Sequence, residues 1–157
     1  MTPKDLMAEA EKARRSSYSP YSKFAVGAAL LTRSGRVFLG CNVENSSFGL
    51  ACCAERTAVF KAVSEGESEF VAVAVTAGKS HGAAPCGACR QVLHEFSPQM
   101  FVYFRDGKGG IVSRNLTELL ADGFTLRPLR KPSPKRSAAP KPGAGPKRSA
   151  SPKRSAR

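Results

Sequence analysis

The sequence predicts an α/β domain in which a mixed sheet of five strands carries helices on both faces. Helical and strand-like segments alternate over the first 121 residues in the order αββαβαββα, and such mixing is typical of α/β folds. The run 70–77 is apolar and valine-rich without interruption, as expected of a strand covered on both faces. The 157 residues suffice for one domain with a real core but are short for two.

The first elements are predicted to be a helix and a pair of antiparallel strands. The helix covers about residues 2–17, because Thr2 is a good N-cap and apolar residues follow at helical spacing. The apolar run 24–31 predicts a buried strand, and Gly27 within it indicates a close approach by another part of the molecule. Residues 36–41 alternate well enough to be the antiparallel partner.

The remaining elements continue the alternation and place several polar and thiol side chains at their ends. We expect a helix, a strand, a helix, two strands and a helix at 50–65, 70–77, 86–96, 100–105, 111–113 and 115–121. The polar run 42–47 leaves the end of the second strand, where binding residues are often found.

Three cysteines in two short motifs form a candidate metal site. Cys86 and Cys89 are three residues apart at the start of a predicted helix and project from one face. Cys53 supplies a third thiol from the start of another helix, and the partial positive charge of helix N-termini favours thiolates. Three protein ligands leave a fourth tetrahedral position for water, which indicates catalysis. Glu55 is then placed to move protons, and Arg56 to compensate the negative charge.

Other interpretations of these side chains remain open. A thioredoxin-like redox pair would follow the first strand of a βαβ unit, whereas this Cys-x-x-Cys follows three predicted strands, which favours zinc. Cys41 and Cys52 have the character of small core residues. His81 lies five residues before Cys86 and is an alternative fourth ligand, although a loop histidine is more often simply exposed. A purely structural zinc module is a further alternative.

The net charge of +13 is concentrated at the C-terminus. Residues 131–157 contain nine Lys or Arg and no acidic residue, so the first 130 residues carry only +4. Six of the eleven prolines lie there, and the pentapeptide Pro-Lys-Arg-Ser-Ala occurs three times, at 134–138, 146–150 and 152–156. We therefore expect a catalytic domain at 1–130 and a disordered basic tail at 131–157, rich in Pro, Lys, Arg, Ser and Ala. The tail predicts weak, sequence-independent binding to nucleic acid; the alternative is a solubilising tail without a dedicated partner.

The segments Cys-Ala-Glu-Arg at 53–56 and Pro-Cys-Gly-Ala-Cys-Arg-Gln at 85–91 resemble the signatures of the small homotetrameric zinc-dependent cytidine deaminases. Residues 24–30 and 40–47 are also similar to that family, so the resemblance covers roughly residues 5–129. It implies a three-layer α/β/α fold, one Zn²⁺ per subunit and a homotetramer with composite active sites. The basic tail has no counterpart in the family pattern.

The resemblance also implies a role for individual residues. Cys53, Cys86 and Cys89 would bind zinc, Glu55 would be the catalytic residue that transfers protons, and Arg56 would offset the thiolate charge. The expected substrate-binding residues are Phe24 at the pyrimidine ring, Asn42 and Glu44 at the ribose 3′-hydroxyl, Ala54 through its backbone, and Phe124 reaching a neighbouring subunit's site. Phe48 departs from the family, whose members often have Tyr there.

The expected function is zinc-dependent hydrolytic deamination of cytidine and deoxycytidine to uridine and deoxyuridine, a hydrolase reaction of pyrimidine salvage. One alternative is a blasticidin-S-type deaminase of aminopyrimidine nucleosides, which shares the zinc motifs. The N-terminus lacks the apolar run of a signal peptide, and no window approaches the roughly 18 apolar residues of a membrane span. A cytoplasmic location and no membrane partner are therefore expected.

Overall fold

The computed structural model describes residues 1–79 and 81–126. The predicted domain boundary after residue 130 and the predicted tail at 131–157 lie outside the described residues. Within the described part the elements are α1 (Pro3–Arg14), β1 (Gly27–Thr32), β2 (Val37–Cys41), the short 3₁₀ helix η1 (Phe48–Leu50), α2 (Ala54–Ser64), β3 (Phe70–Thr76), α3 (Gly87–Phe96), β4 (Phe101–Arg105), β5 (Ile111–Asn115) and α4 (Leu116–Leu119).

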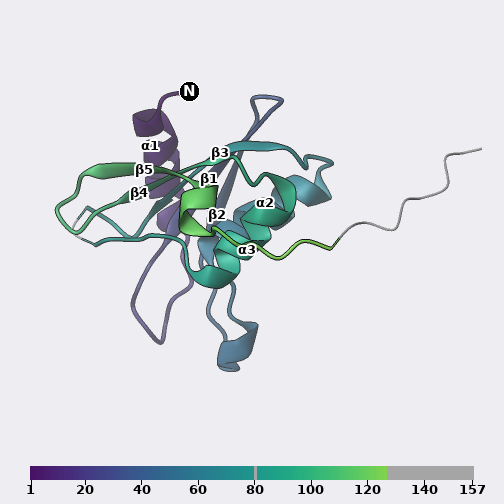
Figure 1. The fold of residues 1–157 in the computed structure, drawn as a ribbon. Coiled ribbons are helices and arrows are strands. Elements are labelled where there is room, and N and C mark those ends of the chain that lie inside the picture. Colours follow the sequence, from purple (N-terminus) through teal and green to yellow (C-terminus); the bar gives the residue numbers. More distant parts are fainter. Residues whose placement is uncertain (80, 127–157) are drawn as a thin grey trace, which may run out of the picture. The chain divides into compact units, whose positions relative to one another are not determined.

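The five strands form one mixed sheet in the order β2-β1-β3-β4-β5 (Figure 1). β1 runs antiparallel to both β2 and β3, and β5 runs antiparallel to β4. β3 and β4 are parallel, and parallel neighbours need a long crossover connection, which here contains α3. The predicted five-stranded mixed sheet is therefore confirmed.

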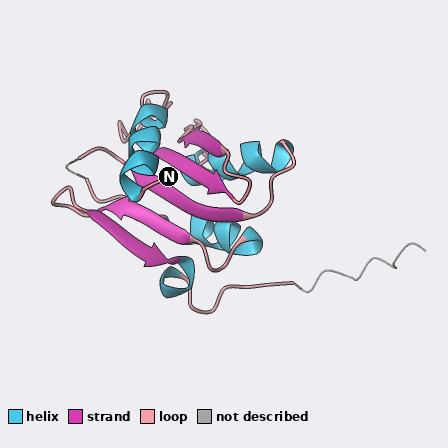
Figure 2. Ribbon diagram, turned by 90° about the horizontal axis from the view of Figure 1, so that it is seen from above, coloured by secondary structure: helices cyan, strands magenta, loops and turns pink. Residues whose placement is uncertain are grey.

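Two separate apolar clusters cover the two faces of the sheet. Leu6 on α1 belongs to one cluster together with Ala74 of β3. Val59 on α2 and Leu93 on α3 belong to the other, together with Val73. Because successive strand side chains point to opposite faces, the neighbours Val73 and Ala74 bury into different layers. Figure 2 shows helices on both sides of the sheet, so the expected three-layer α/β/α arrangement is confirmed.

Helix α1 begins as the sequence predicts but ends earlier. The Asp5 backbone N–H donates to the Thr2 hydroxyl at 3.2 Å, and the Thr2 N–H donates back to the Asp5 carboxylate at 3.0 Å, which is a capping box. The helix stops at Arg14 rather than near residue 17. The chain then turns into a bridge with the segment after β2, where the Tyr18 N–H donates to the Asn42 carbonyl at 3.0 Å.

Two glycines allow helices to approach the sheet closely. A Cβ at Gly27 would lie 2.1 Å from the Ala10 carbonyl oxygen on α1, so the close approach predicted there is confirmed. At Gly40 a Cβ would lie 2.3 Å from the Ala54 carbonyl oxygen in the first turn of α2. Gly40 therefore lets the helix that carries Glu55 dock directly on β2.

The structure corrects three boundaries that bear on the site. β1 begins at Gly27, so Phe24 lies in the loop before the strand and not within it. Cys53 is the N-cap of α2 and Cys86 the N-cap of α3, because these helices begin at Ala54 and Gly87 and not at residues 50 and 86 as predicted. The reason is their backbone conformation: Cys53 is extended, with φ −73° and ψ 156°.

No helix within residues 1–79 and 81–126 combines the length and the apolar character that crossing a membrane requires.

Candidate active site

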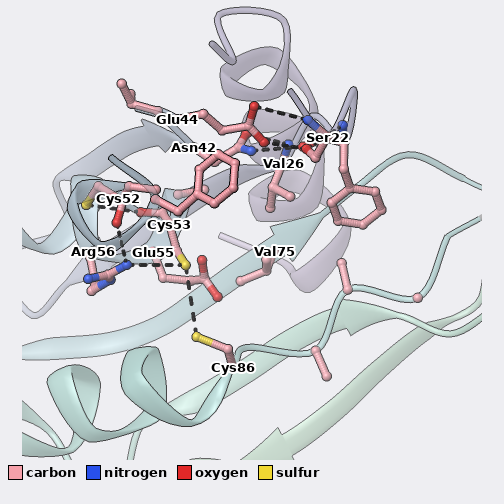
Figure 3. Close-up of a pocket in the computed structure, with 18 residues that line it drawn as sticks. Ser22, Val26, Asn42, Glu44, Cys52, Cys53, Glu55, Arg56, Val75 and Cys86 are labelled. Carbon is pink, nitrogen blue, oxygen red and sulfur yellow. Dashed lines mark hydrogen bonds between the residues drawn. The ribbon is translucent and has the colours of Figure 1, made fainter. Parts of the chain in front are cut away.

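The three thiols of the two motifs converge where α2 and α3 begin. The Sγ atoms of Cys53 and Cys86 are 4.0 Å apart and point toward each other (Figure 3). The Sγ of Cys89, which is fully buried, lies within 4.8 Å of both. Sulfurs that ligate a tetrahedral zinc at 2.3 Å stand about 3.8 Å apart. The donor set and its spacing therefore fit zinc.

The surroundings of Cys53 favour its thiolate. The Arg56 guanidinium donates to the Ala51 carbonyl at 3.2 Å and lies 3.5 Å from the Cys53 sulfur. A hydrogen bond from the Cys89 thiol and the Arg56 charge hold the pKa of Cys53 well below its usual value. The same thiol–thiol bond, together with burial, raises the pKa of Cys89. Of Cys53 and Cys89, Cys53 is thus the first to ionise, and its position as the N-cap of α2 favours the thiolate.

Glu55 lies beside the thiols, in the first turn of α2. Its side chain is only 4% exposed, and burial raises its pKa to about 6, with a further contribution from the negative charge of Cys53. Among the described residues, the cluster suited to hold a metal contains the three thiols and no carboxylate. Glu55 is therefore a buried carboxyl group that can change its protonation state near neutral pH, outside the cluster of three thiols.

A cavity of about 690 Å³ lies beside these groups, a size typical of small-molecule sites. Of the residues predicted to bind substrate, the cavity is lined by Phe24, Asn42, Glu44 and Ala54, and it also exposes Cys53, Glu55, Arg56 and Cys86. Figure 3 shows Asn42 and Glu44 on the wall opposite the thiols. The structure therefore brings the two halves of the predicted site together.

The backbone of residues 42–44 joins the walls of the cavity. Val43 and Cys52 exchange two hydrogen bonds of 2.9 Å, and the Glu44 N–H donates to the Tyr18 carbonyl at 2.8 Å. Residues 42–44 thus pair with the residues just before α2 on one side and with the loop after α1 on the other. These bonds fix the side chains of Asn42 and Glu44 relative to the thiol motif that begins at Cys53.

The side-chain amide of Asn42 is largely used within the protein. Its Oδ1 accepts from the Ser17 hydroxyl at 2.5 Å and from the Val26 N–H at 2.8 Å, and its Nδ2 donates to the Phe24 carbonyl at 2.8 Å. An amide nitrogen carries two hydrogens. Within residues 1–79 and 81–126, the second hydrogen of this amide has no partner.

Phe24 and His81 form an edge-to-face pair with ring centroids 5.9 Å apart. Phe24 contributes its ring to the cavity wall. Within the described part of the chain, His81 is not a member of the thiol cluster, so the alternative in which it closes a metal site gains no support.

Phe124 lies away from this cavity. Its side chain is 67% exposed, and its backbone is held by Gln91, which donates to the Phe124 carbonyl at 2.7 Å and accepts from the Phe124 N–H at 3.1 Å. Phe48, the position that departs from the family, does line the cavity and packs edge-on against Tyr21 at 5.8 Å.

Ser22 is a polar residue of the cavity wall that the sequence did not predict. Its hydroxyl donates to the Glu44 carboxylate and accepts from the Phe24 N–H at 3.0 Å. In the sequence, the only signal for Ser22 was its position two residues before Phe24. Its partner Glu44 lies 22 residues further along the chain, and no sequence pattern connects the two.

Thiols that can hold a metal next to a buried carboxyl group, in a cavity of small-molecule size, define a zinc-dependent hydrolase. A comparison with protein families identifies which one. The family model described as "Cytidine and deoxycytidylate deaminase zinc-binding region" matches residues 1–105. The chain belongs to the cytidine and deoxycytidylate deaminase family, as the two motifs predicted.

Individual proteins that are similar to this chain are members of the same family. The chain is 50% identical over 125 residues to the cytidine deaminase of Sporosarcina psychrophila, covering 79% of this chain and 92% of that protein. It is 42% identical over 124 residues to the cytidine deaminase of Mycobacterium tuberculosis, covering 79% and 90%. The crystal structure of cytidine deaminase from Burkholderia pseudomallei matches the fold with a TM-score of 0.74 at 49% identity, over 79% of this chain and all of that one.

Proposed function

We propose that this protein catalyses the hydrolytic deamination of cytidine and deoxycytidine to uridine and deoxyuridine. The observation that carries the proposal is the buried carboxyl group of Glu55 beside the three-thiol cluster, in a cavity large enough for a nucleoside. Relatives of high identity that cover most of this chain are named cytidine deaminases. This similarity favours cytidine over the substrate of a blasticidin-S-type enzyme.

Zinc is the cofactor, and we assign its binding to Cys53, Cys86 and Cys89. Bound zinc lowers the pKa of a coordinated water from 15.7 to about 7 and so supplies a nucleophile at neutral pH. Glu55 takes up a proton from the attacking water and delivers it to N3 of the pyrimidine. It then takes up the proton of the hydroxyl group added at C4 and delivers it to the amine, which leaves as ammonia. Arg56, in contact with the Cys53 sulfur, offsets part of the negative charge of three thiolates.

The opposite wall of the cavity is assigned to nucleoside recognition. Phe24 offers its ring to the pyrimidine, and the backbone at Ala54 is within the same cavity. Asn42 retains one free hydrogen and Glu44 accepts three hydrogen bonds. Since two carboxylate oxygens offer about four acceptor positions, one position of Glu44 remains for the ribose 3′-hydroxyl.

The charges that line the cavity favour a free nucleoside over a nucleotide. The charged residues among those described in its lining are Glu44, Glu55 and Arg56, and Arg56 is engaged by Cys53 and Ala51. The described lining therefore offers no free cation to pair with the phosphate group of a nucleotide.

The test is a spectrophotometric assay of the zinc-loaded full chain with cytidine, deoxycytidine and deoxycytidylate. We expect conversion of both nucleosides and a kcat/KM for deoxycytidylate that is at least about 100-fold lower, because a charged group that is desolvated without a partner costs about 3 kcal/mol or more. Metal-replete protein that leaves cytidine intact, or that prefers the nucleotide, contradicts the proposal.

We further propose that the chain assembles as a homotetramer in which Phe124 completes a neighbouring subunit's site. Large apolar side chains are exposed on the outer face of α2, at Phe60 and Val63, and at Phe124 and Leu126. Such surfaces commonly mark interfaces between proteins. The molar mass in solution tests the proposal, and a monomer contradicts it.

The repeated basic segment supports a second function, weak association with nucleic acid. The sequence from residue 131 on holds nine basic residues and no acidic one, and each neutralised phosphate contributes a slope of about −0.9 in log K against log salt. We expect the full chain to bind duplex DNA of any sequence weakly, with an affinity that falls steeply with salt. A chain truncated after Leu126 is the control; equal binding by both chains contradicts this assignment.

We assign the reaction to pyrimidine salvage in the cytoplasm. A site built from free thiols needs a reducing compartment, and the described cysteines form no disulfide. Rescue of cells that depend on cytidine as their pyrimidine source, together with cell fractionation, checks the assignment.

A further inference from the structure

The loop between α1 and β1 carries Phe24 into the cavity, and one serine connects this loop to the sugar-binding wall. The Glu44 carboxylate accepts from the Tyr21 N–H at 2.8 Å and from the Ser22 N–H at 3.3 Å. It also accepts from the Ser22 hydroxyl, which is the only side-chain donor among the three. Figure 3 shows Ser22 and Glu44 facing each other across this wall.

The same hydroxyl reaches the backbone of the aromatic residue. The Ser22 Oγ accepts from the Phe24 N–H at 3.0 Å, and the Phe24 carbonyl accepts from the Asn42 amide at 2.8 Å. Both backbone groups of Phe24 are therefore bonded to polar side chains of the cavity wall. No neighbouring strand holds Phe24, because β1 starts only at Gly27.

The loop takes an unusual conformation between these two anchors. Lys23 has φ 57°, in the left-handed region that residues with a Cβ rarely adopt. Its N–H donates to the Ser19 carbonyl at 3.1 Å. A backbone in this region persists when surrounding bonds determine it, and the bonds of Ser22 lie directly beside it.

We propose that Ser22 is a positioning residue of the nucleoside site, whose hydroxyl holds the Glu44 carboxylate and the Phe24 backbone in one arrangement. Recognition of the sugar and placement of the base then depend on a single side chain. The inference rests on the proposed function, because it takes Glu44 and Phe24 as groups that contact the nucleoside. The hydrogen bond from Ser22 is also the largest cause that lowers the pKa of Glu44, which keeps this carboxylate ionised as an acceptor.

The experiment compares the kinetics of Ser22→Ala and Ser22→Thr with wild type, using zinc-loaded full chain and cytidine. A hydrogen bond to a charged group that orients substrate contacts supports binding more than chemistry, so we expect Ser22→Ala to raise KM about 10-fold with kcat within about 3-fold. Ser22→Thr, which keeps the hydroxyl, should bring KM back to within about 3-fold of wild type. A loss of kcat instead, or no recovery in Ser22→Thr, overturns the proposal.

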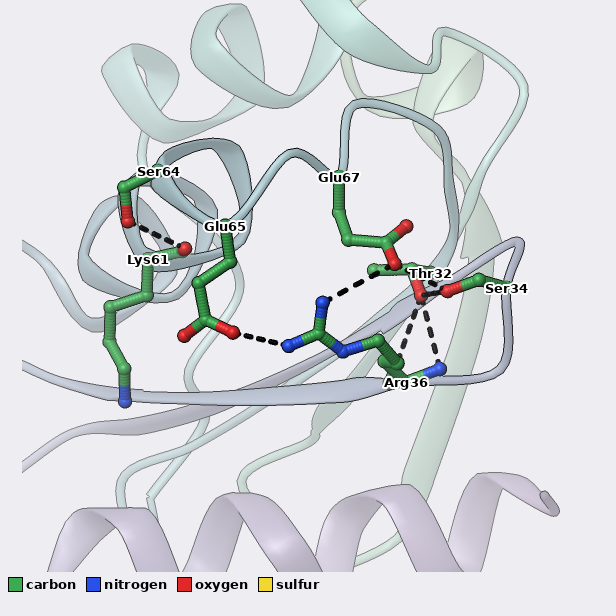
Figure 4. Close-up of polar contacts among 7 residues, drawn as sticks. All are labelled: Thr32, Ser34, Arg36, Lys61, Ser64, Glu65 and Glu67. Atoms are coloured by element: carbon green, nitrogen blue, oxygen red, sulfur yellow. Dashed lines mark hydrogen bonds and ion pairs between the residues drawn. The ribbon is translucent and has the colours of Figure 1, made fainter.

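A matched control exists at the opposite end of β1. The Ser34 hydroxyl donates to the Glu67 carboxylate at 2.6 Å on the surface, in the same kind of bond but far from the cavity lining. Figure 4 shows this pair beside Arg36. Ser34→Ala should leave KM and kcat within about 2-fold of wild type, as expected for a surface substitution. If Ser22→Ala behaves like Ser34→Ala, the inference fails.

A double-mutant cycle shows whether Ser22→Ala raises KM through Glu44 or independently of it. In a Glu44→Ala background, Ser22→Ala should raise KM by less than about 3-fold, because the two residues act as a unit. A repeated 10-fold increase means that the two side chains are independent and the inference is wrong. Should Ser22→Ala fail to fold, Ser22→Cys replaces it, with an expected KM about 3-fold above wild type because a thiol donates more weakly.

The activity of the wild-type protein on cytidine separates a failure of the proposed function from a failure of the role of Ser22. If wild-type protein does not deaminate cytidine, both fall. If wild type deaminates cytidine while Ser22→Ala leaves KM unchanged, the proposed function stands and only the role of Ser22 is refuted.

Discussion

Replacing Glu55 with Gln should lower kcat for cytidine by about 10³-fold while the zinc content stays at one per chain, because a positioned proton carrier contributes about 10² to 10⁴ in rate. Glutamine keeps the shape of the side chain but cannot take up or release a proton. Burial raises the pKa of Glu55 to about 6, and a group that titrates near the working pH is best suited to do both. Kinetics and metal analysis on the same preparation give the two readings.

The control for Glu55→Gln lies on the same helix. Glu65 forms the C-terminal cap of α2 and pairs with Arg36 on the surface, and Figure 4 shows that pair. Glu65→Gln should leave both kcat and zinc unchanged. A parallel loss of zinc in Glu55→Gln means that Glu55 is a metal ligand, which contradicts its assignment as a proton carrier.

The sequence predicts the thiol cluster and Glu55 more completely than the residues that we assign to nucleoside recognition. Cys86 and Cys89 are three residues apart and Glu55 is two from Cys53, so the spacing along two helix starts already places these groups. That the two starts meet follows from the sheet, since both α2 and α3 pack on the same face. The parallel pairing of β3 with β4, which brings them there, is not encoded in any local pattern.

The half of the site that we assign to nucleoside recognition depends on contacts between distant segments. The sequence predicts Phe24 as the first residue of a strand, because apolar residues follow it without a break. The structure holds Phe24 in a loop, through Ser22 on one side and Asn42 on the other. Exposed serines carry no pattern that identifies a partner 22 residues away, so the contacts of Ser22 are apparent only in the folded structure. For the same reason the sequence does not anticipate that most of the Asn42 amide is used within the protein.

Cys86→Ala tests the metal site with little disturbance of the core, since this ligand candidate is exposed whereas Cys89 is fully buried. Loss of one of three protein ligands should weaken zinc binding by more than about 100-fold, which exceeds the 10- to 100-fold effect of residues that only support a ligand. Without the metal the water is not activated at neutral pH, so activity should fall by about 10³-fold or more. Zinc content after dialysis and kcat/KM for cytidine measure the two effects.

A thermal melt adds a readout that does not depend on activity. A metal that binds only the folded chain stabilises it, so Cys86→Ala should melt at the same temperature as wild type stripped of zinc, and added zinc should raise only the wild-type midpoint. Cys52→Ser is the matched control, because Cys52 precedes Cys53 in the same motif, yet its sulfur lies with Thr57 rather than in the thiol cluster. This variant should keep its zinc. If Cys86→Ala retains one zinc per chain instead, the three-thiol assignment is wrong, because the metal must then be held by a set of ligands that does not require Cys86.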